Sequence, residues 1–519
     1  MPIFVRDVQQ AKRDIAAARA AGAEMIELRI DAVWGSPSAG PDRMAVIKSA
    51  CEDACHADRP WILTCRSASE GGQYPGDEEN RMELLESLAG DQNTPNYVDL
   101  ELAAASSADL AKSLRGSAKL ILSSHDFQGR PDRLFNLLLE MDQSPCDIKK
   151  LAWTARTIRD NLEAFEILRR PEKATIALCM GEVGVISRIL AKKFGAFLTF
   201  ASLSDESATA PGQVSIADMK GLYRWDKINR QTKVYGVVAH PVGHSMSPAI
   251  HNAAFDATNY DGIYLPLLVN PGYESFKAFM ETFVPFEGLD LGGLSVTLPH
   301  KENALRYLQE KGGQIEELAA RIGAVNTIII DRSGGTPNLS GINTDYAAIL
   351  DSITLASGIQ RAKLKDVRVA VLGAGGTGRT ATAALTHFGA KVTVFNRTFE
   401  KAEALAAEFG ASAQPWEKLS ECDCQIYVNA TSVGMHPRAF ENPFGDHPPK
   451  LGRDSVVFDT IYNPMRTRLI VQASAARAKT VGGVEMFVQQ AMAQFSAWTK
   501  LPAPKDVMRR VIEARLGGS

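Results

Sequence analysis

Short apolar runs alternate with amphipathic stretches over residues 1–222, a rhythm typical of repeated strand–helix units. A chain built this way forms a parallel sheet, and the number of units predicts a closed (β/α)8 TIM-type barrel. In such barrels the carboxyl ends of the strands carry the chemistry. The runs expected to be strands are Met25–Ile30, Trp61–Cys65, Tyr97–Leu100, Lys119–Ser123, Ile148–Trp153, Ala174–Met180 and Phe197–Ala201.

The pattern changes in the second half of the chain. The polar segment Tyr223–Lys233 interrupts the strand–helix rhythm and is interpreted as a linker. A new strand, Val234–Ala239, then follows, and a helix is expected over Tyr346–Leu355. The strand Val367–Leu372 leads through a glycine turn and a helix into another strand, which is one βαβ unit of a Rossmann domain.

The composition is ordinary for a globular protein, with 45% hydrophobic and 23% charged residues and a formal net charge of -3. Because acidic and basic residues are interspersed, neither a nucleic acid nor a membrane is expected as a partner. No apolar run reaches the length of a membrane span, and the N-terminus lacks a signal-peptide core. Seven cysteines among 519 residues are sparse and odd in number, which fits reduced thiols in a cytoplasmic compartment.

A glycine-rich turn follows the strand Val367–Leu372 and opens a helix. Glycine allows a tight turn and a close approach of the backbone to a pyrophosphate, whose charge meets the helix N-terminus. An ordinary tight turn is the alternative, but the strand–helix context favours dinucleotide binding. The G-x-G-x-x-G pattern is formed by Gly373, Gly375 and Gly378, with Ala374, Gly376 and Thr377 between them.

The second strand of this unit ends at Asn396, Arg397 and Thr398, with Lys401 nearby. NAD-dependent enzymes usually place an acidic residue there to bind the ribose hydroxyls. A guanidinium suits the additional 2′-phosphate of NADP. The sequence therefore predicts NADP(H) as the cofactor, and the alternative is a solvated arginine at a strand end.

Polar residues that precede the Rossmann unit indicate a substrate pocket. Ser245 and Ser247 lie two residues apart between a strand and a helix, and hydroxyls spaced this way can hold a carboxylate or a polyol. Taken alone, this segment could equally be a helix cap. Lys301 and Asp345 are the candidate proton-transfer pair, although either of them alone could be a surface charge.

The barrel half offers Lys150 at the end of an apolar strand and His125 in the run SSHDF. A lysine desolvated in a barrel mouth favours imine formation with a ketone. An ordinary strand-end charge is the alternative, and spacing alone leaves both interpretations open.

From Val234 to the C-terminus the sequence resembles shikimate dehydrogenase, through GHSMSP, SVTLPHK, GAVNT, NTD, GAGGTG, NRT, NATSVGM, FDTIYNP and GVEMFVQQA in this order. The resemblance implies NADPH-dependent reduction of 3-dehydroshikimate, with Lys301 and Asp345 at the reacting oxygen. The segment after Gly482 is expected to fold back and place Gln490 beside Ser247. The other implied roles are carboxylate binding by Ser245 and Ser247, hydroxyl binding by Thr297, Asn326 and Gln490, a position near the site for Tyr462, and a cofactor cleft lined by Asn429, Thr431, Ser432 and Met435.

Residues up to 222 resemble the type I, barrel-type 3-dehydroquinate dehydratase, through ELRID, TCR with EGG, SSHDF, DIKKLA, ISRIL and APGQ. The resemblance implies that Lys150 forms the imine, that Lys149 lies on the opposite face of the strand, and that His125 is the general acid and base. No metal is needed for this reaction. The other implied roles are orientation of His125 by Glu70, carboxylate binding by Arg188, and hydroxyl binding and ordering of the pocket by Glu27, Arg29, Arg66 and Gln213, while Thr209 stands where the family often has serine.

These resemblances also imply a division of the chain. We expect a dehydratase barrel at residues 1–222, a linker at 223–233, a shikimate-binding α/β domain from 234–345 and 481–519, and an NADP-binding Rossmann domain at 346–480. The expected function is bifunctional, because the product of the first half is the substrate of the second.

Two other functions stay open. The second half could be a quinate dehydrogenase, against which Ser247 and Arg397 argue. The chain could also be a catalytically dead regulator that senses these metabolites, but it keeps both candidate lysines, and a sensor needs neither chemistry. The expected partners are the small molecules 3-dehydroquinate, 3-dehydroshikimate and shikimate, for a monomer or homodimer in the cytoplasm, or in a plastid if a transit peptide is missing from this sequence.

Overall fold

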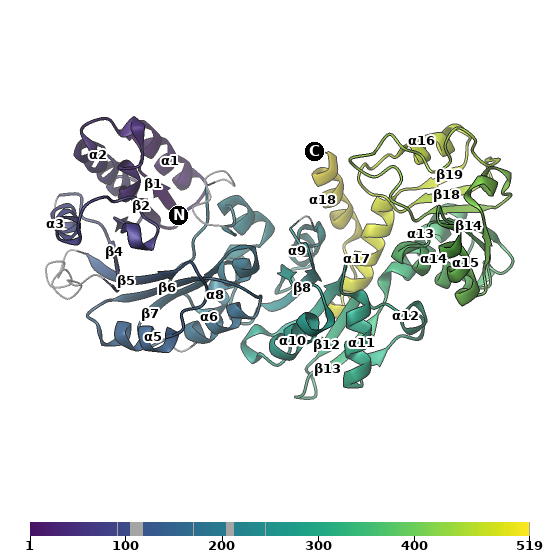
Figure 1. Ribbon diagram of the computed structural model, residues 1–519, viewed down its shortest axis with the longest axis horizontal. Helices are drawn as coiled ribbons and strands as arrows, with labels where there is room; N and C mark the ends of the chain where they lie inside the picture. Colours follow the sequence, from purple (N-terminus) through teal and green to yellow (C-terminus); the bar gives the residue numbers. More distant parts are fainter. Residues whose placement is uncertain (91, 104–117, 170, 204–211, 244, 518–519) are drawn as a thin grey trace. The chain divides into compact units, whose positions relative to one another are not determined.

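The computed structural model describes residues 1–90, 92–103, 118–169, 171–203, 212–243 and 245–517. The chain divides into two compact units (Figure 1). The first comprises Met1–Lys233 with Leu267–Asn270 and Phe279–Asp290, and the second comprises Val234–Pro266, Pro271–Ala278 and Leu291–Ser519.

The first unit is built on a seven-stranded parallel sheet in the order β1-β2-β3-β4-β5-β6-β7. The sheet is curled, and helices lie along its outer side (Figure 1). Its strands are β1 Pro2–Phe4, β2 Ile26–Arg29, β3 Trp61–Thr64, β4 Tyr97–Glu101, β5 Lys119–Asp126, β6 Ile148–Thr154 and β7 Ala174–Met180. Its helices include α1 Val8–Ala20, α2 Arg43–Cys55, α3 Glu78–Ala89, α5 Leu134–Gln143, α6 Asp160–Arg169, α7 Val185–Ile189 and α8 Ala191–Phe194.

The starts of the first three helices are fixed by their sequence. Asp7, Asp42 and Asp77 precede α1, α2 and α3, and each carboxylate accepts a hydrogen bond from a backbone N–H in the first turn. Such caps satisfy donors that a helix N-terminus would otherwise leave unpaired. Strands β3, β6 and β7 are almost wholly buried, which explains their continuous apolar runs.

The α/β class and the strand–helix order agree with the sequence prediction, but the expected eighth strand does not form. Phe197–Ala201 pairs with no strand, although the N–H of Phe197 bonds to the carbonyl of Thr175. Further along, Ser202 forms an isolated bridge with Ser215. Its backbone N–H and carbonyl are therefore bonded to the residues on either side of Ser215 and not to a strand of the sheet. Within the described residues the sheet is therefore a curled seven-stranded one, and the expectation of a strand at Phe197–Ala201 was wrong.

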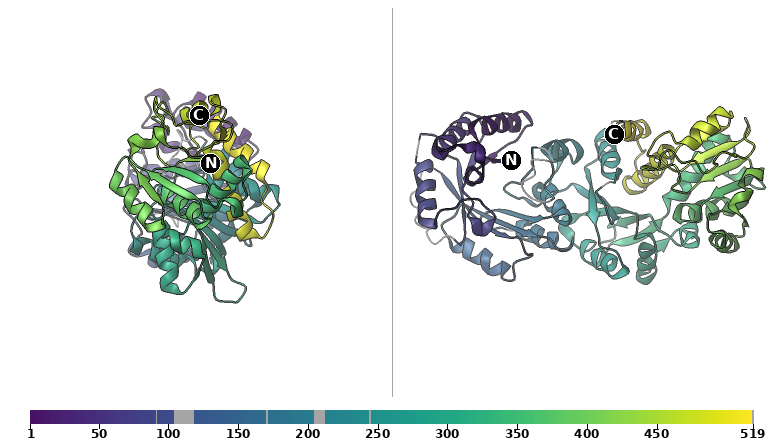
Figure 2. Two further views of the ribbon diagram at one scale, coloured as in Figure 1. Left: turned by 90° about the vertical axis from the view of Figure 1, so that its right-hand side faces the viewer. Right: turned by 45° about the horizontal axis from the view of Figure 1, so that its top comes forward.

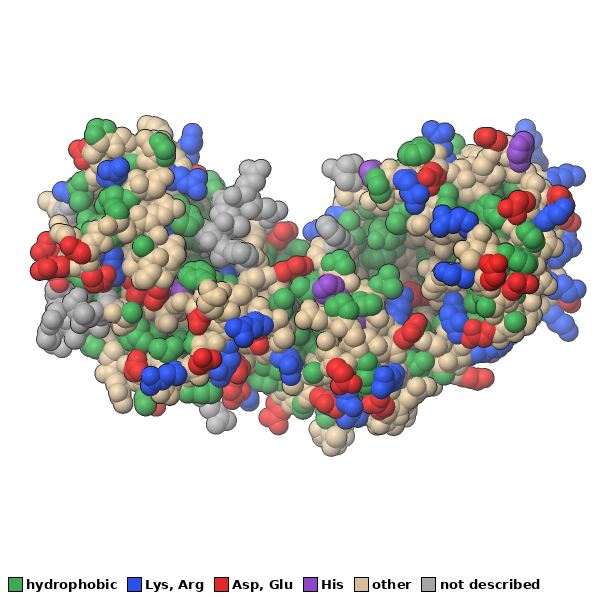
Figure 3. Space-filling view, in the orientation of Figure 1, with side chains coloured by type: hydrophobic (Ala, Val, Ile, Leu, Met, Phe, Trp, Pro, Cys, Tyr) green, Lys and Arg blue, Asp and Glu red, His purple; other side chains and the backbone are tan. Residues whose placement is uncertain are grey.

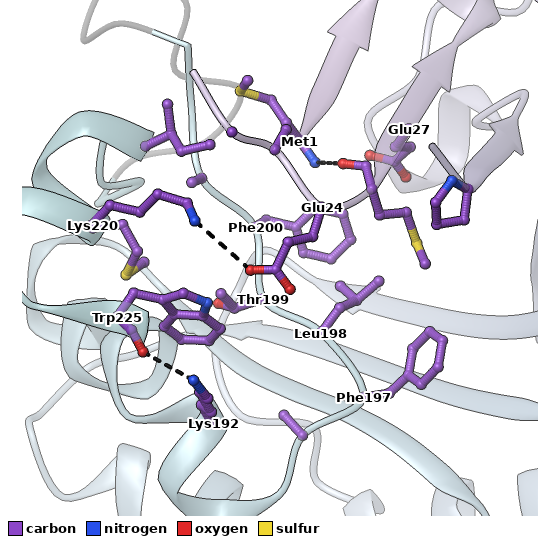
Figure 4. Close-up of a pocket in the computed structure, with 18 of the residues that line it drawn as sticks. Met1, Glu24, Glu27, Lys192, Phe197, Leu198, Thr199, Phe200, Lys220 and Trp225 are labelled. Carbon is purple, nitrogen blue, oxygen red and sulfur yellow. Dashed lines mark hydrogen bonds and ion pairs between the residues drawn. The ribbon is translucent and has the colours of Figure 1, made fainter. Parts of the chain in front are cut away.

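A cavity of about 430 Å³ lies where the eighth strand was expected (Figure 4). Met1 and Glu24 line it together with the residues from Phe197 to Ala201. Lys220 lies 4.0 Å from the carboxylate of Glu24, and Lys192 donates a hydrogen bond to the carbonyl of Trp225. These two contacts lie at the wall of the cavity and join residues that precede β2 and follow β7 to the segment around Lys220 and Trp225.

Two further sheets are formed mainly by residues of the second unit. The first is mixed and six-stranded, in the order β11-β13-β12-β10-β8-β9. Its strands are β8 Lys233–Ala239, β9 Gly262–Leu268, β10 Leu291–Val296, β11 Gln314–Ile315, β12 Thr327–Asp331 and β13 Asn338–Ile342. The associated helices are α9 Ser247–Ala257, α10 Tyr273–Phe283, α11 Lys301–Lys311, α12 Glu317–Ile322, α17 Gly483–Thr499 and α18 Lys505–Gly517.

The last two helices of the chain return to this mixed sheet (Figure 2, yellow). The indole N–H of Trp498 donates to the carbonyl of Ile328 over 3.1 Å, and Phe495 packs on Phe255. Helix α17 contacts β10 and β12, and α18 contacts α9. The expected fold-back of the segment after Gly482 is therefore present.

The second sheet is parallel, in the order β16-β15-β14-β17-β18-β19. This is the doubly wound order of a Rossmann domain, in which ligands bind where the strand order reverses, here between β14 and β17. Its strands are β14 Arg368–Leu372, β15 Lys391–Phe395, β16 Ser412–Gln414, β17 Ile426–Asn429, β18 Val456–Asp459 and β19 Lys479–Val481, and its helices are α13 Thr344–Ser357, α14 Gly376–His387, α15 Phe399–Phe409 and α16 Arg468–Ala475.

The surface agrees with the near-neutral composition. Lys and Arg side chains alternate with Asp and Glu side chains over the visible face of each unit (Figure 3). Among the helices of the described ranges, none combines the length and the apolar character needed to cross a membrane.

Candidate active sites

Strand β6 places two neighbouring lysines on opposite faces. Lys149 bonds to Asp142 of α5 over 2.5 Å, outside the curled sheet. Lys150 is buried on the inner face, where its Nζ donates to Asp99 Oδ2 over 2.7 Å and lies 3.6 Å from Glu27 Oε1. The expected alternation of the two lysines is therefore present, because side chains alternate along a strand.

Asp99 joins Lys150 to a buried arginine. Arg66 donates from Nη2 to Asp99 Oδ1 over 2.8 Å and from Nη1 to Glu101 over 3.1 Å and to Ser123 over 2.8 Å. Burial alone would raise the pKa of Asp99, but the Arg66 guanidinium and the Lys150 ammonium hold it well below its ordinary value. Asp99 therefore stays ionised between two cations.

Asp99 was not found from the sequence. The signal was present, because Asp99 and Glu101 alternate with apolar residues in Tyr97–Glu101 and so share one face of β4. Two carboxylates inside a sheet need cations, which Arg66 and Lys150 supply.

Glu70 and His125 form a second pair in the same pocket. Glu70 ends a short helical turn, and its Oε2 lies 2.8 Å from His125 Nδ1 while accepting the His125 backbone N–H over 3.1 Å. Burial, assisted by the charges of Arg66 and Lys150, lowers the pKa of His125 well below its ordinary value. Burial also raises the pKa of Glu70 to about 7. The imidazole is thus neutral near pH 7 and is fixed through Nδ1, which leaves Nε2 for a substrate.

These groups surround one cavity of about 130 Å³. Burial lowers the pKa of Arg188 to about 10, and its buried Nε has no hydrogen-bond partner among the described residues. A buried cation with an unused donor fits a substrate anion. The cavity brings together the predicted residues Glu27, Arg29, Arg66, Glu70, His125, Lys150, Arg188 and Gln213, with Phe4, Phe127 and Phe200 around them, whereas Thr209 lies outside the described residues.

The mixed sheet of the second unit holds another lysine–aspartate pair. Lys301 begins α11, and Asp345 lies in the first turn of α13, capped by Asn343. Lys301 Nζ donates to Asp345 Oδ2 over 2.6 Å. Both side chains keep contact with solvent, with exposed fractions of 32% and 16%. The sequence-predicted proton-transfer pair is therefore assembled from two distant helices.

A cavity of about 510 Å³ adjoins this pair. Thr377 of the glycine turn also lines it, so the cavity reaches the nucleotide-binding sheet. It brings together the predicted residues Ser245, Ser247, Thr297, Lys301, Asn326, Asp345, Tyr462 and Gln490, and adds Ser295 and Gln494, which the sequence reasoning missed.

A buried chain of hydrogen bonds runs beneath this cavity. It starts at the hydroxyl of Tyr264, which donates to Ser295 over 2.6 Å, and it ends at Thr344, next to Asp345. Its links are Tyr264 to Ser295, Ser295 to Gln494, Gln494 to Thr327, Thr327 to Asn326, and Asn326 to Thr344, with donor–acceptor distances from 2.6 to 3.0 Å. The chain connects α17 with the pocket floor and fixes the orientation of Asn326.

The glycine turn between β14 and α14 has the shape of a phosphate cradle. Gly373 has a φ of 106°, which favours glycine, and a Cβ on Gly378 would lie 2.0 Å from the Gly373 carbonyl. A Cβ on Gly375 or Gly376 would meet nothing within 4 Å, so this side of the turn is open. Since α14 begins at Gly376, its N-terminus faces the open side, where an anion would be stabilised.

Polar side chains frame this cradle. Asn396, at the end of β15, accepts the N–H of Ala374 and donates to the carbonyl of Thr398. Arg397 and Lys401 are exposed at the same strand end, where two cations fit an additional phosphate. Asn429 at the end of β17 orients Thr431, while Ser432 and Met435 are exposed further along that loop. In the described residues no three His, Cys, Asp or Glu side chains gather into a group suited to a metal ion.

Fold and pockets together define an α/β protein with two separate lysine–aspartate sites, the second of them beside a dinucleotide-binding turn. Comparison with known families agrees with this division. Residues 1–230 match the family described as type I 3-dehydroquinase. Residues 237–328, 354–437 and 483–513 match the shikimate dehydrogenase substrate-binding domain, shikimate/quinate 5-dehydrogenase, and the shikimate 5′-dehydrogenase C-terminal domain.

The chain belongs to the family of bifunctional 3-dehydroquinate dehydratase/shikimate dehydrogenases. It is 36% identical to the chloroplastic bifunctional enzyme of Arabidopsis thaliana, over 98% of this chain and 83% of that protein. It is also 36% identical to the NADP(+) shikimate dehydrogenase of Methanosarcina acetivorans, over 54% of this chain and 97% of that protein. A solved shikimate 5-dehydrogenase from Thermus thermophilus, in complex with NADP(H) and shikimate, is 33% identical over 54% of this chain and 99% of that chain, with a TM-score of 0.46.

Proposed function

We propose that this chain dehydrates 3-dehydroquinate to 3-dehydroshikimate at Lys150 and reduces that product to shikimate with NADPH at Lys301. The observation that carries the proposal is that each unit places one lysine, hydrogen-bonded to an aspartate, in a cavity lined by the residues these reactions need. The type I dehydratase and shikimate dehydrogenase families, matched in this order, support it.

In the first site, Lys150 gives up a proton and its amine attacks the ketone carbon of 3-dehydroquinate. The ketone oxygen leaves as water when the imine forms, and the imine acidifies the adjacent carbon. Neutral His125, held at Nδ1 by Glu70, removes a proton from that carbon. The resulting enamine expels the hydroxyl group, and protonated His125 returns the proton to the leaving oxygen. Arg188 binds the substrate carboxylate, and hydrolysis of the imine frees both Lys150 and the product.

The other polar residues of this cavity order it. Arg66 and Asp99 hold Lys150 in place, and Glu27 and Arg29 contact hydroxyl groups of the substrate. Gln213 and the hydroxyl of Thr209 complete the binding of the substrate. This role for Thr209 rests on the sequence motif alone.

In the second site, Lys301 donates a proton to the ketone oxygen of 3-dehydroshikimate, and Asp345 positions its ammonium group. Ser245 and Ser247 bind the carboxylate, and Thr297, Asn326 and Gln490 bind ring hydroxyls beside Tyr462. The nicotinamide supplies the hydride when NADPH is bound.

The Rossmann residues fit that cofactor. The open side of Gly375 and Gly376 would hold the pyrophosphate, with Gly373, Ala374, Thr377 and Gly378 shaping the turn. Asn396, Arg397, Thr398 and Lys401 would hold the 2′-phosphate. Asn429, Thr431, Ser432 and Met435 would line the cleft on the other side.

We further propose the division expected from the sequence, with a dehydratase domain at 1–222, a linker at 223–233, a shikimate-binding domain from 234–345 and 481–519, and a Rossmann domain at 346–480. We place the protein in the cytoplasm, as a monomer or homodimer. Gel filtration with light scattering tests the oligomeric state.

The decisive test supplies 3-dehydroquinate and NADPH to the purified chain and follows the loss of nicotinamide absorbance. Wild type is expected to consume NADPH, whereas Lys150→Ala should do so only when given 3-dehydroshikimate. Lys149→Ala is the matched control and should keep both reactions. Consumption of NADPH from 3-dehydroquinate by Lys150→Ala would overturn the first site.

Two further measurements define each site. Borohydride added during turnover should trap the substrate on Lys150, and mass spectrometry of the peptides locates the adduct. Lys301→Ala should still release 3-dehydroshikimate but leave NADPH unused. Faster turnover of quinate than of shikimate would overturn the assignment of the second substrate, and inactivity on every substrate would indicate a sensor.

A further inference from the structure

Two cysteines lie side by side just before β17, a central strand of the Rossmann sheet, far along the chain from the cofactor turn. Cys422 and Cys424 flank Asp423, just before β17, and their Sγ atoms are 3.3 Å apart. Cys422 is partly exposed, whereas Cys424 is buried with 7% exposure. The Cys422 thiol is therefore accessible to a dissolved reagent, and the Cys424 thiol is close enough to react with Cys422.

A single tyrosine holds the two cysteines together. The hydroxyl of Tyr427 donates to the carbonyl of Cys422 over 2.7 Å and accepts the N–H of Cys424 over 3.1 Å. Tyr427 itself is buried on β17 and packs edge-on against Phe444. Both ends of the Cys422–Cys424 segment are thus tied to one rigid side chain, which keeps the thiols close.

The surroundings make the two thiols unequal. The contact with the Cys424 thiol lowers the pKa of Cys422, and the same contact together with burial raises the pKa of Cys424. Arg368 binds Asp423 through both its carbonyl and its carboxylate, and its charge adds to the lowering at Cys422. By contrast, burial raises the pKa of Cys65 and Cys179, which have no neighbouring thiol.

We propose that Cys422 and Cys424 form a hydroperoxide-sensitive dithiol that closes into a reversible disulfide. Two residues of chain span at most about 7 Å, and a disulfide accepts Cα separations of up to about 6.8 Å. Closure therefore requires only a slight bend of the segment and a rotation of the side chains.

The reaction balances in two steps. The Cys422 thiolate attacks one oxygen of hydrogen peroxide, the O–O bond breaks, and hydroxide leaves as Cys422 becomes a sulfenic acid. The Cys424 thiol then attacks that sulfur, forms the S–S bond and displaces a water molecule. In sum, the two thiols lose two electrons and two protons, and the peroxide becomes two molecules of water. A partly exposed disulfide of this kind is reopened by a thiol reductant.

The test treats the reduced full-length chain with hydrogen peroxide and counts free thiols after denaturation. The seven thiols of wild type should fall to five and return to seven with dithiothreitol. A peptide map should show Cys422 joined to Cys424. The matched control is Cys55→Ser, which removes the exposed thiol of α2 and should still lose two thiols.

Cys424→Ser separates the two steps. In this variant Cys422 should stop at the sulfenic acid, which dimedone traps, and no pair of thiols should disappear. A wild-type peptide map without the Cys422–Cys424 link, or oxidation confined to Cys55, would overturn the proposal. Because the map is made on wild type, this outcome does not depend on the folding of any variant.

Discussion

The two units contain the same pair of side chains in different surroundings. Lys150 bonds to Asp99 over 2.7 Å with side chains 6% and 1% exposed, and Lys301 bonds to Asp345 over 2.6 Å with 32% and 16% exposed. The distances are nearly equal, so the difference lies in burial and in the neighbouring charges. Lys150 and Asp99 lie among Arg66, Glu27 and Glu101, whereas Lys301 and Asp345 form no second ion pair with any described residue.

This difference matches the chemistry proposed for each site. A covalent imine must be shielded from premature hydrolysis, and each buried charge then needs a partner. A lysine that passes a proton to a product alkoxide must afterwards regain a proton, and contact with solvent provides it. In the proposed chemistry, the aspartate therefore holds a nucleophilic lysine in place in one unit and a proton-donating lysine in the other.

Replacing each aspartate by asparagine should separate these roles most clearly. Asp99→Asn leaves Arg66 and Lys150 without their shared carboxylate, and we expect the dehydratase kcat/KM to fall about 10³-fold, with unfolding easier by about 3 kcal/mol. Asp345→Asn should lower the reductase kcat/KM by roughly 10²-fold, with stability changed by less than about 1 kcal/mol. Steady-state kinetics and denaturant titration measure both. Equal losses of stability in the two variants would contradict the comparison.

The pH dependence of the dehydratase sharpens the comparison further. A histidine of ordinary pKa would be mostly protonated at pH 5.5, and kcat/KM would fall about tenfold from its value at pH 8. Because burial lowers the pKa of His125, the imidazole stays neutral as the pH falls through 6.5, and we expect kcat/KM at pH 5.5 to remain within about twofold.

Glu70→Gln is the control for this profile, since its amide keeps a hydrogen-bonding group beside His125 but cannot titrate. If wild type loses activity near pH 7 and Glu70→Gln does not, the Glu70 carboxyl group, whose pKa is raised to about 7, controls the profile instead of His125.

A smaller effect is expected from the buried hydrogen-bond chain under the second cavity. Tyr264→Phe removes the hydroxyl that donates to Ser295 and leaves the ring in place. We expect the KM for 3-dehydroshikimate to rise about tenfold, equivalent to ~1.4 kcal/mol, because Gln494 and Asn326 lose their fixed orientation. The dehydratase should be unaffected, which the same preparation shows directly. A change in kcat alone would argue against a positioning role.

The smallest effect concerns acid stability. Burial lowers the pKa of His251 to about 3, so this group is neutral when folded and takes up a proton below pH 6.5 when unfolded. Its stabilising contribution is present above pH 6.5 and decreases as the pH falls toward 3, by at most ~1.4 kcal/mol per pH unit. His251→Phe should flatten this dependence between pH 6.5 and 5, measured by urea unfolding of the second unit. If His251→Phe leaves the pH dependence of the free energy of unfolding unchanged, His251 does not contribute to acid stability.

Local patterns were sufficient for most of the fold. The apolar runs predicted seven of the strands named above within one or two residues, and the glycine turn predicted the Rossmann unit. The segment Phe197–Ala201 has the composition of a strand but pairs with no strand. The backbone of the next residue, Ser202, pairs with the segment around Ser215 instead. Strand propensity is local, whereas closure of a sheet is not.

The candidate sites show the same division. Lys150, His125, Lys301 and Asp345 were found because they stand in recognisable motifs, and the structure brings each into a cavity. Asp99, Tyr264 and Gln494 lie in apolar strands and helices without a motif, and only their packing reveals them. Residues that support a site are therefore harder to predict than residues that face the substrate.

Helix α17 contributes to only one of the two cavities, so the two cavities can be completed at different stages of synthesis. No described residue after Gln213 lines the cavity around Lys150. This cavity can therefore be complete before the residues of the second cavity have been synthesised. The cavity around Lys301 also needs Gln490 and Gln494 of α17, which follow Gln213 by more than half of the sequence and are therefore synthesised much later. Domains generally fold in order of synthesis. We therefore expect a nascent chain to gain dehydratase activity first, and reductase activity only after α17 has left the exit tunnel.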